Sequence, residues 1–137
     1  MRSDIVYSGR GQRTAVGPPC SVKISVEDLA GLLDRPDTGL LVLDVREPAE
    51  LELCMLPGAV NVPLGELHLR LEEITIKLEE LARIAEPCEN GLHMVTVCAS
   101  GNRSATAAEL LSRQGWRVAD LDGGMNAWQS FQCARRD

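Results

Sequence analysis

The chain of 137 residues is predicted to form one α/β domain, with a central parallel sheet of about five strands and helices on both faces. Two observations predict this class. Apolar runs rich in β-branched residues alternate along the chain with segments whose apolar residues recur every three or four positions. In addition, the run at residues 40–45 is apolar apart from Asp44, which is typical of a strand buried on both faces of a parallel sheet.

Each expected element has its own local signal. Ser25, followed three residues later by Asp28, resembles a capping box before a helix that runs through Leu33. Pro48 suits a first helical turn, and Gly115 suits the end of a helix. Strands are therefore expected at residues 22–24, 40–45, 59–62, 94–97 and 118–121, further helices at 47–53, 64–85, 103–114 and 125–131, and turns at 36–39 and 57–58.

The longest helical pattern covers residues 64–85. Its apolar residues recur at steps of three or four, and charged residues fill the opposite face. A charged face of this kind is usually solvated, and that is the expectation here. The alternative is that this acidic helix is a docking surface for a partner protein.

Composition narrows the class of protein. Hydrophobic residues make up 45% and charged residues 25%, which is ordinary for a globular domain, while 3% aromatic residues imply a mainly aliphatic core. The formal net charge of −6, from 14 basic and 20 acidic residues, disfavours nucleic acid and acidic membranes as partners. The chain has no run of 18 apolar residues, so we do not expect a transmembrane helix.

The cysteines indicate the cellular compartment, and the composition of the two ends of the chain indicates the bounds of the folded domain. Five scattered cysteines do not indicate a disulfide framework or a metal site, so we expect reduced thiols, a cytoplasmic location, and no metal or cofactor. Residues 1–20 are rich in Gly, Arg, Ser and Pro and are expected to be a disordered tail, with a transit peptide as the alternative. The folded domain is expected to span residues 21–131, with a short tail at 132–137.

The segment VTVCASGNRS at residues 95–104 carries the most chemical information. It places Cys98 after a strand and before a helix, at the sheet edge where open α/β sheets bind ligands. Helix amino ends offer unpaired N–H groups and a partial positive charge, and Arg103 adds a fixed charge with several donors. The residues between Cys98 and Arg103 are small enough for the loop to curl with its amides pointing inward, as in an anion-binding nest; they are Ala99, Ser100, Gly101 and Asn102.

A sulfur in this position is predicted to be a thiolate. The pKa of a free cysteine is about 8.5, and helix amino ends and cationic neighbours can lower it to about 3.5–7.5. Cys98 is therefore a candidate nucleophile, and Arg103 is the candidate partner of an anionic substrate. The alternative is a buried structural cysteine followed by N-capping Asn and Ser residues; the combination of loop, arginine and placement favours the nucleophile.

Three blocks of sequence, in this order and at these spacings, resemble those of a single-domain rhodanese, the thiosulfate sulfurtransferase-like family. The resemblance covers residues 21–129. The first block is LVLDVRE at 41–47, running into LPGAVNVP at 56–63, the second is CASGNRS at 98–104, and the third is GW at 115–116 followed by LDGGMNAW at 121–128.

The resemblance implies a rhodanese-like fold and sulfur transfer with ping-pong kinetics. Cys98 would attack the outer sulfur of thiosulfate, or of a persulfide or polysulfide donor, and become a persulfide; a thiol or cyanide would then accept the sulfur. Arg103 would orient and neutralise the donor, and a protein thiol is a further candidate acceptor. The donor would be bound by Ala99, Ser100, Gly101, Asn102 and Ser104. Phosphatases of this fold are implied to have five residues between Cys and Arg instead of four, so phosphatase activity is not favoured.

Four other residues of these blocks are expected to support the site. Asp44 and Arg46 look like the family's Asp-x-Arg pair, in which Arg46 would anchor neighbouring loops through carboxylate or carbonyl bonds. Gly123 and Gly124 are expected to allow a close turn beside the active loop. Trp128 is expected to be a core residue.

The chain departs from the family at Cys54-Met55-Leu56, where members commonly have Gly-His-Ile. Cys54 is expected to pack under a loop, but it raises a second hypothesis, a thiol redox enzyme that uses a Cys54–Cys98 disulfide.

A third hypothesis is a non-catalytic sulfur-carrier or interaction module that presents Cys98 to a partner protein. Catalytic turnover with thiosulfate would favour the enzyme, and loading only from a desulfurase would favour the carrier.

Overall fold

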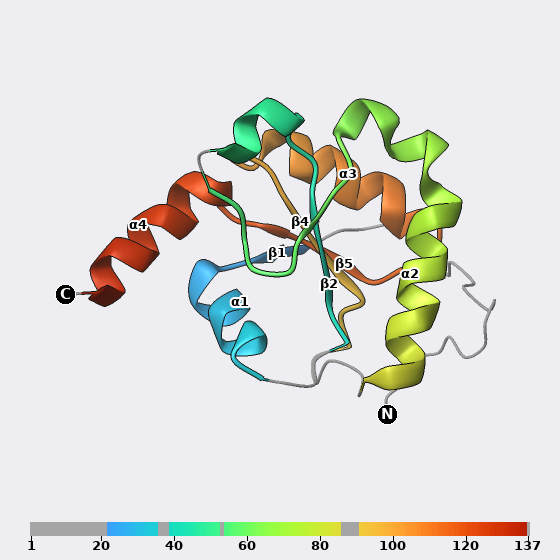
Figure 1. Ribbon diagram of the computed structural model, residues 1–137, viewed down its shortest axis with the longest axis horizontal. Coiled ribbons are helices and arrows are strands. Elements are labelled where there is room, and N and C mark those ends of the chain that lie inside the picture. Colours follow the sequence, from blue (N-terminus) through green and yellow to red (C-terminus); the bar gives the residue numbers. More distant parts are fainter. Residues whose placement is uncertain (1–21, 36–38, 53, 86–90, 137) are drawn as a thin grey trace.

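The computed structural model describes residues 22–35, 39–52, 54–85 and 91–136. Five parallel strands form its central sheet in the order β1-β5-β4-β2-β3 (Figure 1). The strands are β1 (Val22–Ile24), β2 (Leu41–Asp44), β3 (Val60–Asn61), β4 (Met94–Val97) and β5 (Val118–Leu121). The predicted parallel sheet is therefore confirmed, and each strand lies within one residue of its expected bounds.

Helices cover both faces of the sheet, as predicted. On one face lie α1 (Val26–Leu33) and α4 (Gly124–Arg136), which contact each other (Figure 1). On the other face lie the 3₁₀ helix η2 (Leu64–Leu69), α2 (Leu71–Ile84) and α3 (Asn102–Ser112). A second 3₁₀ helix, η1 (Pro48–Glu52), follows β2. The side chain of Ser25 accepts the backbone N–H of Asp28 and so caps α1 at its predicted start.

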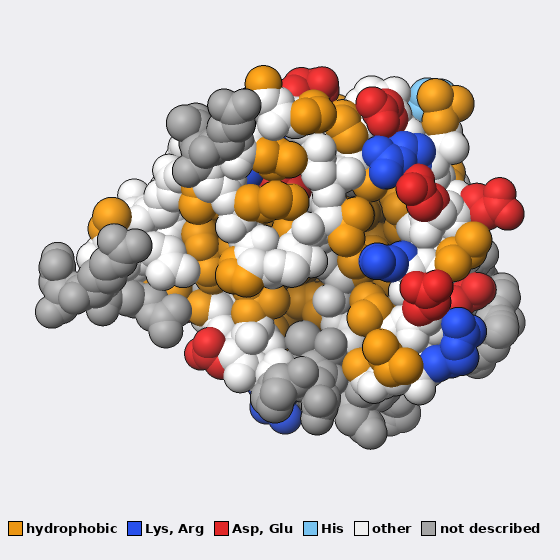
Figure 2. Space-filling model, in the orientation of Figure 1, with side chains coloured by type: hydrophobic (Ala, Val, Ile, Leu, Met, Phe, Trp, Pro, Cys, Tyr) orange, Lys and Arg blue, Asp and Glu red, His pale blue; other side chains and the backbone are white. Residues whose placement is uncertain are grey.

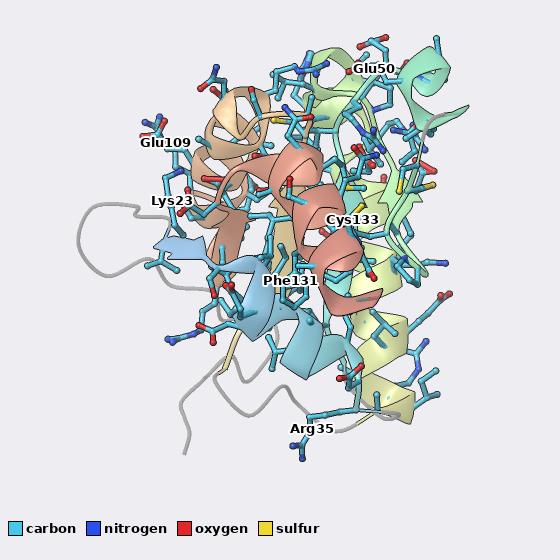
Figure 3. The ribbon with its side chains drawn as sticks, turned by 90° about the vertical axis from the view of Figure 1, so that its left-hand side faces the viewer. Lys23, Arg35, Glu50, Glu109, Phe131 and Cys133 are labelled. Carbon is cyan, nitrogen blue, oxygen red and sulfur yellow. The ribbon has the colours of Figure 1, made fainter. Side chains whose placement is uncertain are left out.

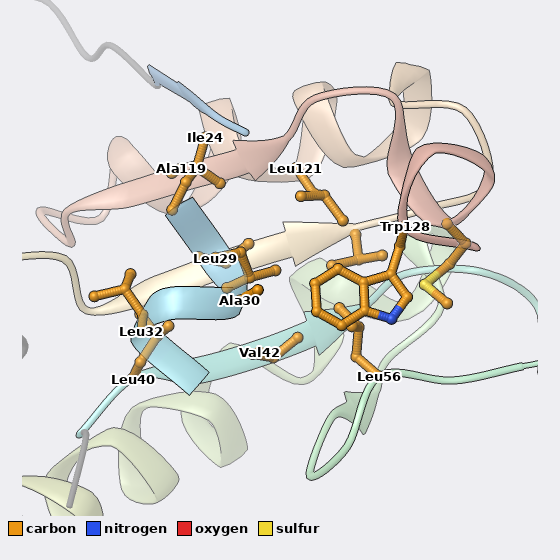
Figure 4. Close-up of a cluster of buried hydrophobic side chains, with 13 residues drawn as sticks. Ile24, Leu29, Ala30, Leu32, Leu40, Val42, Leu56, Ala119, Leu121 and Trp128 are labelled. Carbon is orange, nitrogen blue, oxygen red and sulfur yellow. The ribbon is translucent and has the colours of Figure 1, made fainter. Parts of the chain in front are cut away.

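The apolar core consists of two clusters, one on each face of the sheet. Successive residues of β2 alternate between them: Leu41 and Leu43 face α2 and α3, while Val42 faces α1 and α4. Figure 4 shows the cluster on the α1–α4 face, in which the indole of Trp128 packs beside Leu56. The strands are buried on both faces, which explains their nearly continuous apolar sequences.

The helix expected at residues 64–85 is divided into η2 and α2. Arg70, between them, has φ −113° and ψ 18°, outside the α-helical range. The chain changes direction at this point, so that η2 contacts α3 before α2 begins (Figure 1). The Arg70 guanidinium bonds to Glu66 in η2 and to Glu73 in α2 and so links the two helices.

Two other helices differ from expectation. The segment expected as a helix at residues 47–53 forms the 3₁₀ helix η1, and α4 continues through Arg136 because no Gly or Pro follows Phe131 to stop it. Residues 132–136, expected to be part of a tail, therefore belong to a helix. The expected tail at residues 1–20 and most of the turn at 36–39 lie outside the described residues.

The charged face of α2 is exposed, as expected for a solvated helix. Figure 2 shows acidic and basic side chains gathered on the right-hand side of the molecule, where Figure 1 places α2. The exposed charged residues of this helix include Glu72, Glu73, Lys77, Glu79 and Glu80. Within the described part of the chain, no helix combines the length and apolar character that crossing a membrane requires.

Candidate active site

Cys98 directly follows β4, and α3 begins four residues later at Asn102. Because β4 lies between β2 and β5, the loop of residues 98–101 is near the middle of the carboxyl edge of the sheet. The buried alanines Ala107 and Ala108 let α3 pack closely on β4 and β5. The predicted order of strand, cysteine, loop and helix is therefore present in the folded chain.

The Cys98 sulfur accepts a hydrogen bond from the backbone N–H of Gly101, with Sγ and N 3.0 Å apart. Gly101 has φ 110°, in the left-handed region that favours glycine, and it is the N-cap residue of α3. Cys98 is only 1% exposed and packs against apolar residues on the α2–α3 face. The sulfur is thus buried, but it lies at a helix amino end, where unpaired N–H groups favour a negative charge.

Hydrogen bonds lower the pKa of the Cys98 thiol. Burial is the largest single influence and acts the other way, since it disfavours the charged thiolate. The favourable influences come from the Ser104 hydroxyl and from the backbone N–H groups of Ser104, Gly101 and Ser100, and together they outweigh burial. Cys98 therefore has the electrostatic surroundings of a nucleophilic cysteine.

A polar network joins α3 to β4 and β5, and its side chains are buried except for that of Lys23. Oγ of Ser104 donates to Oδ1 of Asp120 at 3.0 Å, and Nζ of Lys23, labelled in Figure 3, donates to Oδ2 at 2.7 Å. The Thr96 hydroxyl donates to the carbonyl oxygen of Ser104 at 2.9 Å. Because the Ser104 hydroxyl has one proton, it can serve either Asp120 or the Cys98 sulfur at a given moment. The network ties the first turn of α3 to β4 and β5.

Arg103 is bound to Glu50 in a bidentate ion pair. Its Nη1 and Nη2 donate to Oε2 and Oε1 of Glu50, each at 2.8 Å. Glu50 extends from η1 at the upper end of the molecule (Figure 3), and its Oε2 also accepts the backbone N–H of Glu47 at 2.9 Å. The hydrogen bonds from Arg103, followed by that from Glu47, lower the pKa of Glu50 to about 2. Both members of the pair are therefore charged at neutral pH.

Asp44 and Arg46 form a buried ion pair at the end of β2. Nε of Arg46 lies 2.9 Å from Oδ1 of Asp44, and its Nη2 lies 2.7 Å from Oδ2. The same guanidinium donates to the carbonyl oxygen of Glu50 at 3.3 Å and to that of Cys54. Arg46 thus anchors the segment that carries Glu50, and through Glu50 this segment reaches Arg103.

The amino end of α4 holds the active loop by its backbone. The N–H groups of Met125 and Asn126 donate to the carbonyl oxygens of Cys98 and Ala99, at 2.8 and 3.0 Å. These bonds use unpaired N–H groups of the first helical turn. Two helix amino ends, those of α3 and α4, therefore meet at the same loop.

Gly123 and Gly124 make this approach sterically feasible. Both have left-handed backbone conformations, with φ 80° and 60°. A Cβ on Gly124 would overlap the carbonyl oxygen of Cys98 and the carbonyl group of Ala99. A Cβ on Gly123 would lie 2.6 Å from the Cβ of Ala127. The two glycines thus lie beside the active loop, and a side chain at Gly124 would displace it.

The fold brings most of the predicted site residues to one place. Of the loop residues expected to bind a donor, Ser100 and Asn102 are exposed and Ala99 is partly buried, while Gly101 and Ser104 are buried. Sequence reasoning missed two carboxylates at the candidate site, Glu50 beside Arg103 and Asp120 beside Ser104. An acidic residue within the apolar run of residues 118–121 was an available signal for Asp120, whereas no local signal linked Glu50 to Arg103.

The described cysteines do not form a pair. Cys54, Cys98 and Cys133 are free thiols, and Cys20 and Cys88 lie outside the described residues. Cys54 packs against the cluster on the α1–α4 face, whereas Cys98 belongs to the cluster on the opposite face. Among the described residues, no group of three or more His, Cys, Asp or Glu side chains is arranged to hold a metal ion.

Fold and site together define a class: an open parallel α/β protein in which a cysteine sulfur is held at a helix amino end by loop amides. The family model for the rhodanese-like domain matches residues 25–131. The chain therefore belongs to the rhodanese-like domain family, and the resemblance found in its sequence is confirmed.

Two similar proteins are named as sulfurtransferases. Adenylyltransferase and sulfurtransferase MOCS3 of Danio rerio is 33% identical over 115 residues, which cover 77% of this chain and 25% of that protein. Thiosulfate:glutathione sulfurtransferase of Saccharomyces cerevisiae is 29% identical over 107 residues, covering 77% of this chain and 76% of that protein. The chain thus spans about a quarter of the length of the MOCS3 relative and most of the yeast relative.

Solved structures show the same fold. A rhodanese-related protein from Thermoplasma volcanium has a TM-score of 0.60 and 31% sequence identity, covering 80% of this chain and 92% of that chain. The Bacillus anthracis protein CoADR-RHD has a TM-score of 0.65 and 26% identity, but the match covers 84% of this chain and only 18% of that chain. The rhodanese-like fold therefore occurs both as a nearly complete chain and as part of a longer one.

Proposed function

We propose that this chain is a sulfurtransferase that moves a sulfane sulfur through a persulfide on Cys98. The observation that carries the proposal is the hydrogen bond from the Gly101 N–H to the Cys98 sulfur, in surroundings that lower the pKa of the thiol. The family match and the sulfurtransferase names of the relatives support this class of reaction.

The proposed reaction has two half-reactions, giving ping-pong kinetics. First, the Cys98 thiolate attacks the outer sulfur of thiosulfate or of a persulfide or polysulfide. A bond forms between the two sulfurs, and the remainder of the donor leaves with the electron pair, as sulfite or as a thiolate. Next, a thiol or cyanide attacks the outer sulfur, and Cys98 leaves as a thiolate. The same N–H groups would stabilise this thiolate as nucleophile and as leaving group.

The proposal gives roles to the other groups at the loop. Backbone N–H groups of residues 99–104 would bind the donor and then the negative outer sulfur of the persulfide. Arg103 would orient the donor with N–H groups that remain beside those used by Glu50. The acceptor would be a small thiol or a thiol on a partner protein, in a reducing compartment such as the cytoplasm, where free cysteines persist.

Intact-mass analysis tests the proposal. After exposure to thiosulfate or to glutathione persulfide, the wild type is expected to gain the mass of one sulfur atom, and Cys98→Ser is expected to gain none. Cys133→Ser, which removes an exposed thiol of α4, is the matched control and should load normally. Undiminished loading of Cys98→Ser would refute the proposal.

Turnover distinguishes the enzyme from a sulfur carrier. Repeated conversion of donor and cyanide to thiocyanate, at many cycles per protein molecule, is the expected result. A single stoichiometric loading that requires a desulfurase would identify a carrier instead. The redox alternative gains no support from the positions of Cys54 and Cys98 on opposite faces, and mass spectrometry after mild peroxide should therefore show no crosslink between them.

A further inference from the structure

Arg103 cannot offer its full positive charge to a bound anion. Both terminal nitrogens of Arg103 donate to the carboxylate of Glu50, at 2.8 Å each, and two of the five guanidinium N–H donors are used in this way. The remaining donors can still orient a bound molecule. The charge of Arg103, however, is matched by an equal and opposite charge in direct contact.

Glu50 is held in this position from behind. Its Oε2 accepts the backbone N–H of Glu47, and its carbonyl oxygen accepts Nη1 of Arg46. Arg46 is in turn fixed by the buried carboxylate of Asp44. The ion pair between Glu50 and Arg103 is therefore supported by the frame of the site, while its side chains are 33% and 37% exposed.

The local charges disfavour a doubly charged donor. The loop residues Ala99, Ser100, Gly101 and Asn102 carry no charge, and the nucleophile is itself an anion. Thiosulfate brings two negative charges within one bond of the sulfur that is transferred. An organic persulfide or polysulfide brings at most one charge to the transferred sulfur, and any other charges lie farther away. Close charges of like sign repel strongly where water is partly excluded.

We propose that Glu50 sets donor specificity by neutralising Arg103, so that the site prefers persulfide and polysulfide donors over thiosulfate. The inference rests on the sulfur transfer through Cys98 proposed above and names its donor class. Glu50 does not itself contact the donor; it acts through Arg103 and so determines which donor the site prefers. Its carboxylate takes the place at the guanidinium that the sulfonate group of thiosulfate would otherwise occupy.

The test compares two donors in the wild type and in two variants. We measure kcat/KM for thiosulfate and for glutathione persulfide, with cyanide as the acceptor, in the wild type, Glu50→Gln and Glu109→Gln. Glutamine keeps one oxygen as an acceptor for Arg103 but removes the charge. Glu50→Gln is expected to raise kcat/KM for thiosulfate relative to the persulfide by about tenfold, mainly through KM. Glu109→Gln removes an exposed charge farther along α3 and should leave the ratio unchanged.

Other outcomes separate the competing explanations. If Glu50→Gln lowers kcat/KM by the same factor for both donors, Glu50 only positions Arg103 and the specificity proposal is wrong. Glu50→Asp keeps the charge, so it should retain the wild-type donor ratio even where its rates fall. If Glu50→Gln does not fold, added salt serves as the second measurement: it should raise kcat/KM for thiosulfate more than for the persulfide, and an equal response refutes the proposal. Failure of the proposed function itself would look different, since wild-type Cys98 would then accept no sulfur from either donor.

Discussion

The backbone N–H of Met125 donates a 2.8 Å hydrogen bond to the carbonyl oxygen of Cys98, which fastens the amino end of α4 to the residue that carries the proposed nucleophile. On its other side, the loop leads into α3, whose N-cap residue Gly101 donates to the Cys98 sulfur. The loop is therefore held through its backbone by one helix and through its sulfur by the other. Such double fixation keeps the N–H groups oriented before a donor arrives.

Gly124→Ala is expected to disable sulfur loading. Its Cβ would overlap the carbonyl groups of Cys98 and Ala99, and φ 60° adds backbone strain of about 1–3 kcal/mol. Displacement of the loop should lower the rate of persulfide formation on the order of a hundredfold. The measurements are stopped-flow loading from glutathione persulfide and urea denaturation.

Gly31→Ala is the matched control for that substitution. Gly31 lies in α1, and a Cβ at this position would meet no other atom within 4 Å, so alanine should stabilise the fold by up to about 1 kcal/mol. Its loading rate should equal that of the wild type. A normal loading rate in Gly124→Ala would show that the close approach of α4 does not matter for the loop.

Ser104→Ala is expected to raise the pKa of the Cys98 thiol, because the variant loses a hydroxyl whose influence lowers that pKa. A group that favours the thiolate lowers the pKa of the thiol, so its loss should move the titration toward higher pH. The thiolate absorbance is titrated against pH, with Cys98→Ser subtracted. Ser112→Ala removes a hydroxyl on the same helix that donates to the carbonyl oxygen of Glu109, and it should leave the titration unchanged. Identical curves for the two serine variants would contradict the assignment.

Arg46→Met is expected to destabilise the fold by about 3–5 kcal/mol, because it leaves the buried carboxylate of Asp44 without its partner. In contrast, Arg70→Met breaks solvent-exposed ion pairs with Glu66 and Glu73, which water screens, and should change stability far less. Urea denaturation of both variants gives the comparison. Adding Asp44→Asn to Arg46→Met should recover part of the loss, and no recovery would argue against a charge penalty.

His93 is expected to make stability depend on mildly acidic pH. Burial, followed by the charge of Arg117, lowers its pKa from 6.5 to about 4. The folded state therefore binds this proton less readily than the unfolded state. The contribution of neutral His93 to the free energy of unfolding is fully present above about pH 6.5 and is lost as the pH falls toward 4. His93→Gln should have a flatter profile of unfolding free energy over this range. Parallel profiles for wild type and His93→Gln would contradict the assignment.

Much of the fold could be predicted because its signals are local. Each strand is marked by a short apolar run, and the serine cap of α1 lies within three residues of its partner N–H. The helix boundaries were less predictable. Nothing in the apolar periodicity of residues 64–85 indicates the break at Arg70, because the contact of η2 with α3 decides where the chain turns.

The order of elements, the family and the candidate nucleophile could therefore be inferred from the amino-acid sequence, since the strand, the small-residue loop and the helix around Cys98 are contiguous. The charges around that nucleophile were decided only in the folded molecule. Glu50 reaches Arg103 across 53 residues, and Asp120 reaches Ser104 across 16. Such residues meet only when β2, β4 and β5 pair side by side, because pairing brings the carboxyl ends of distant strands to one edge of the sheet.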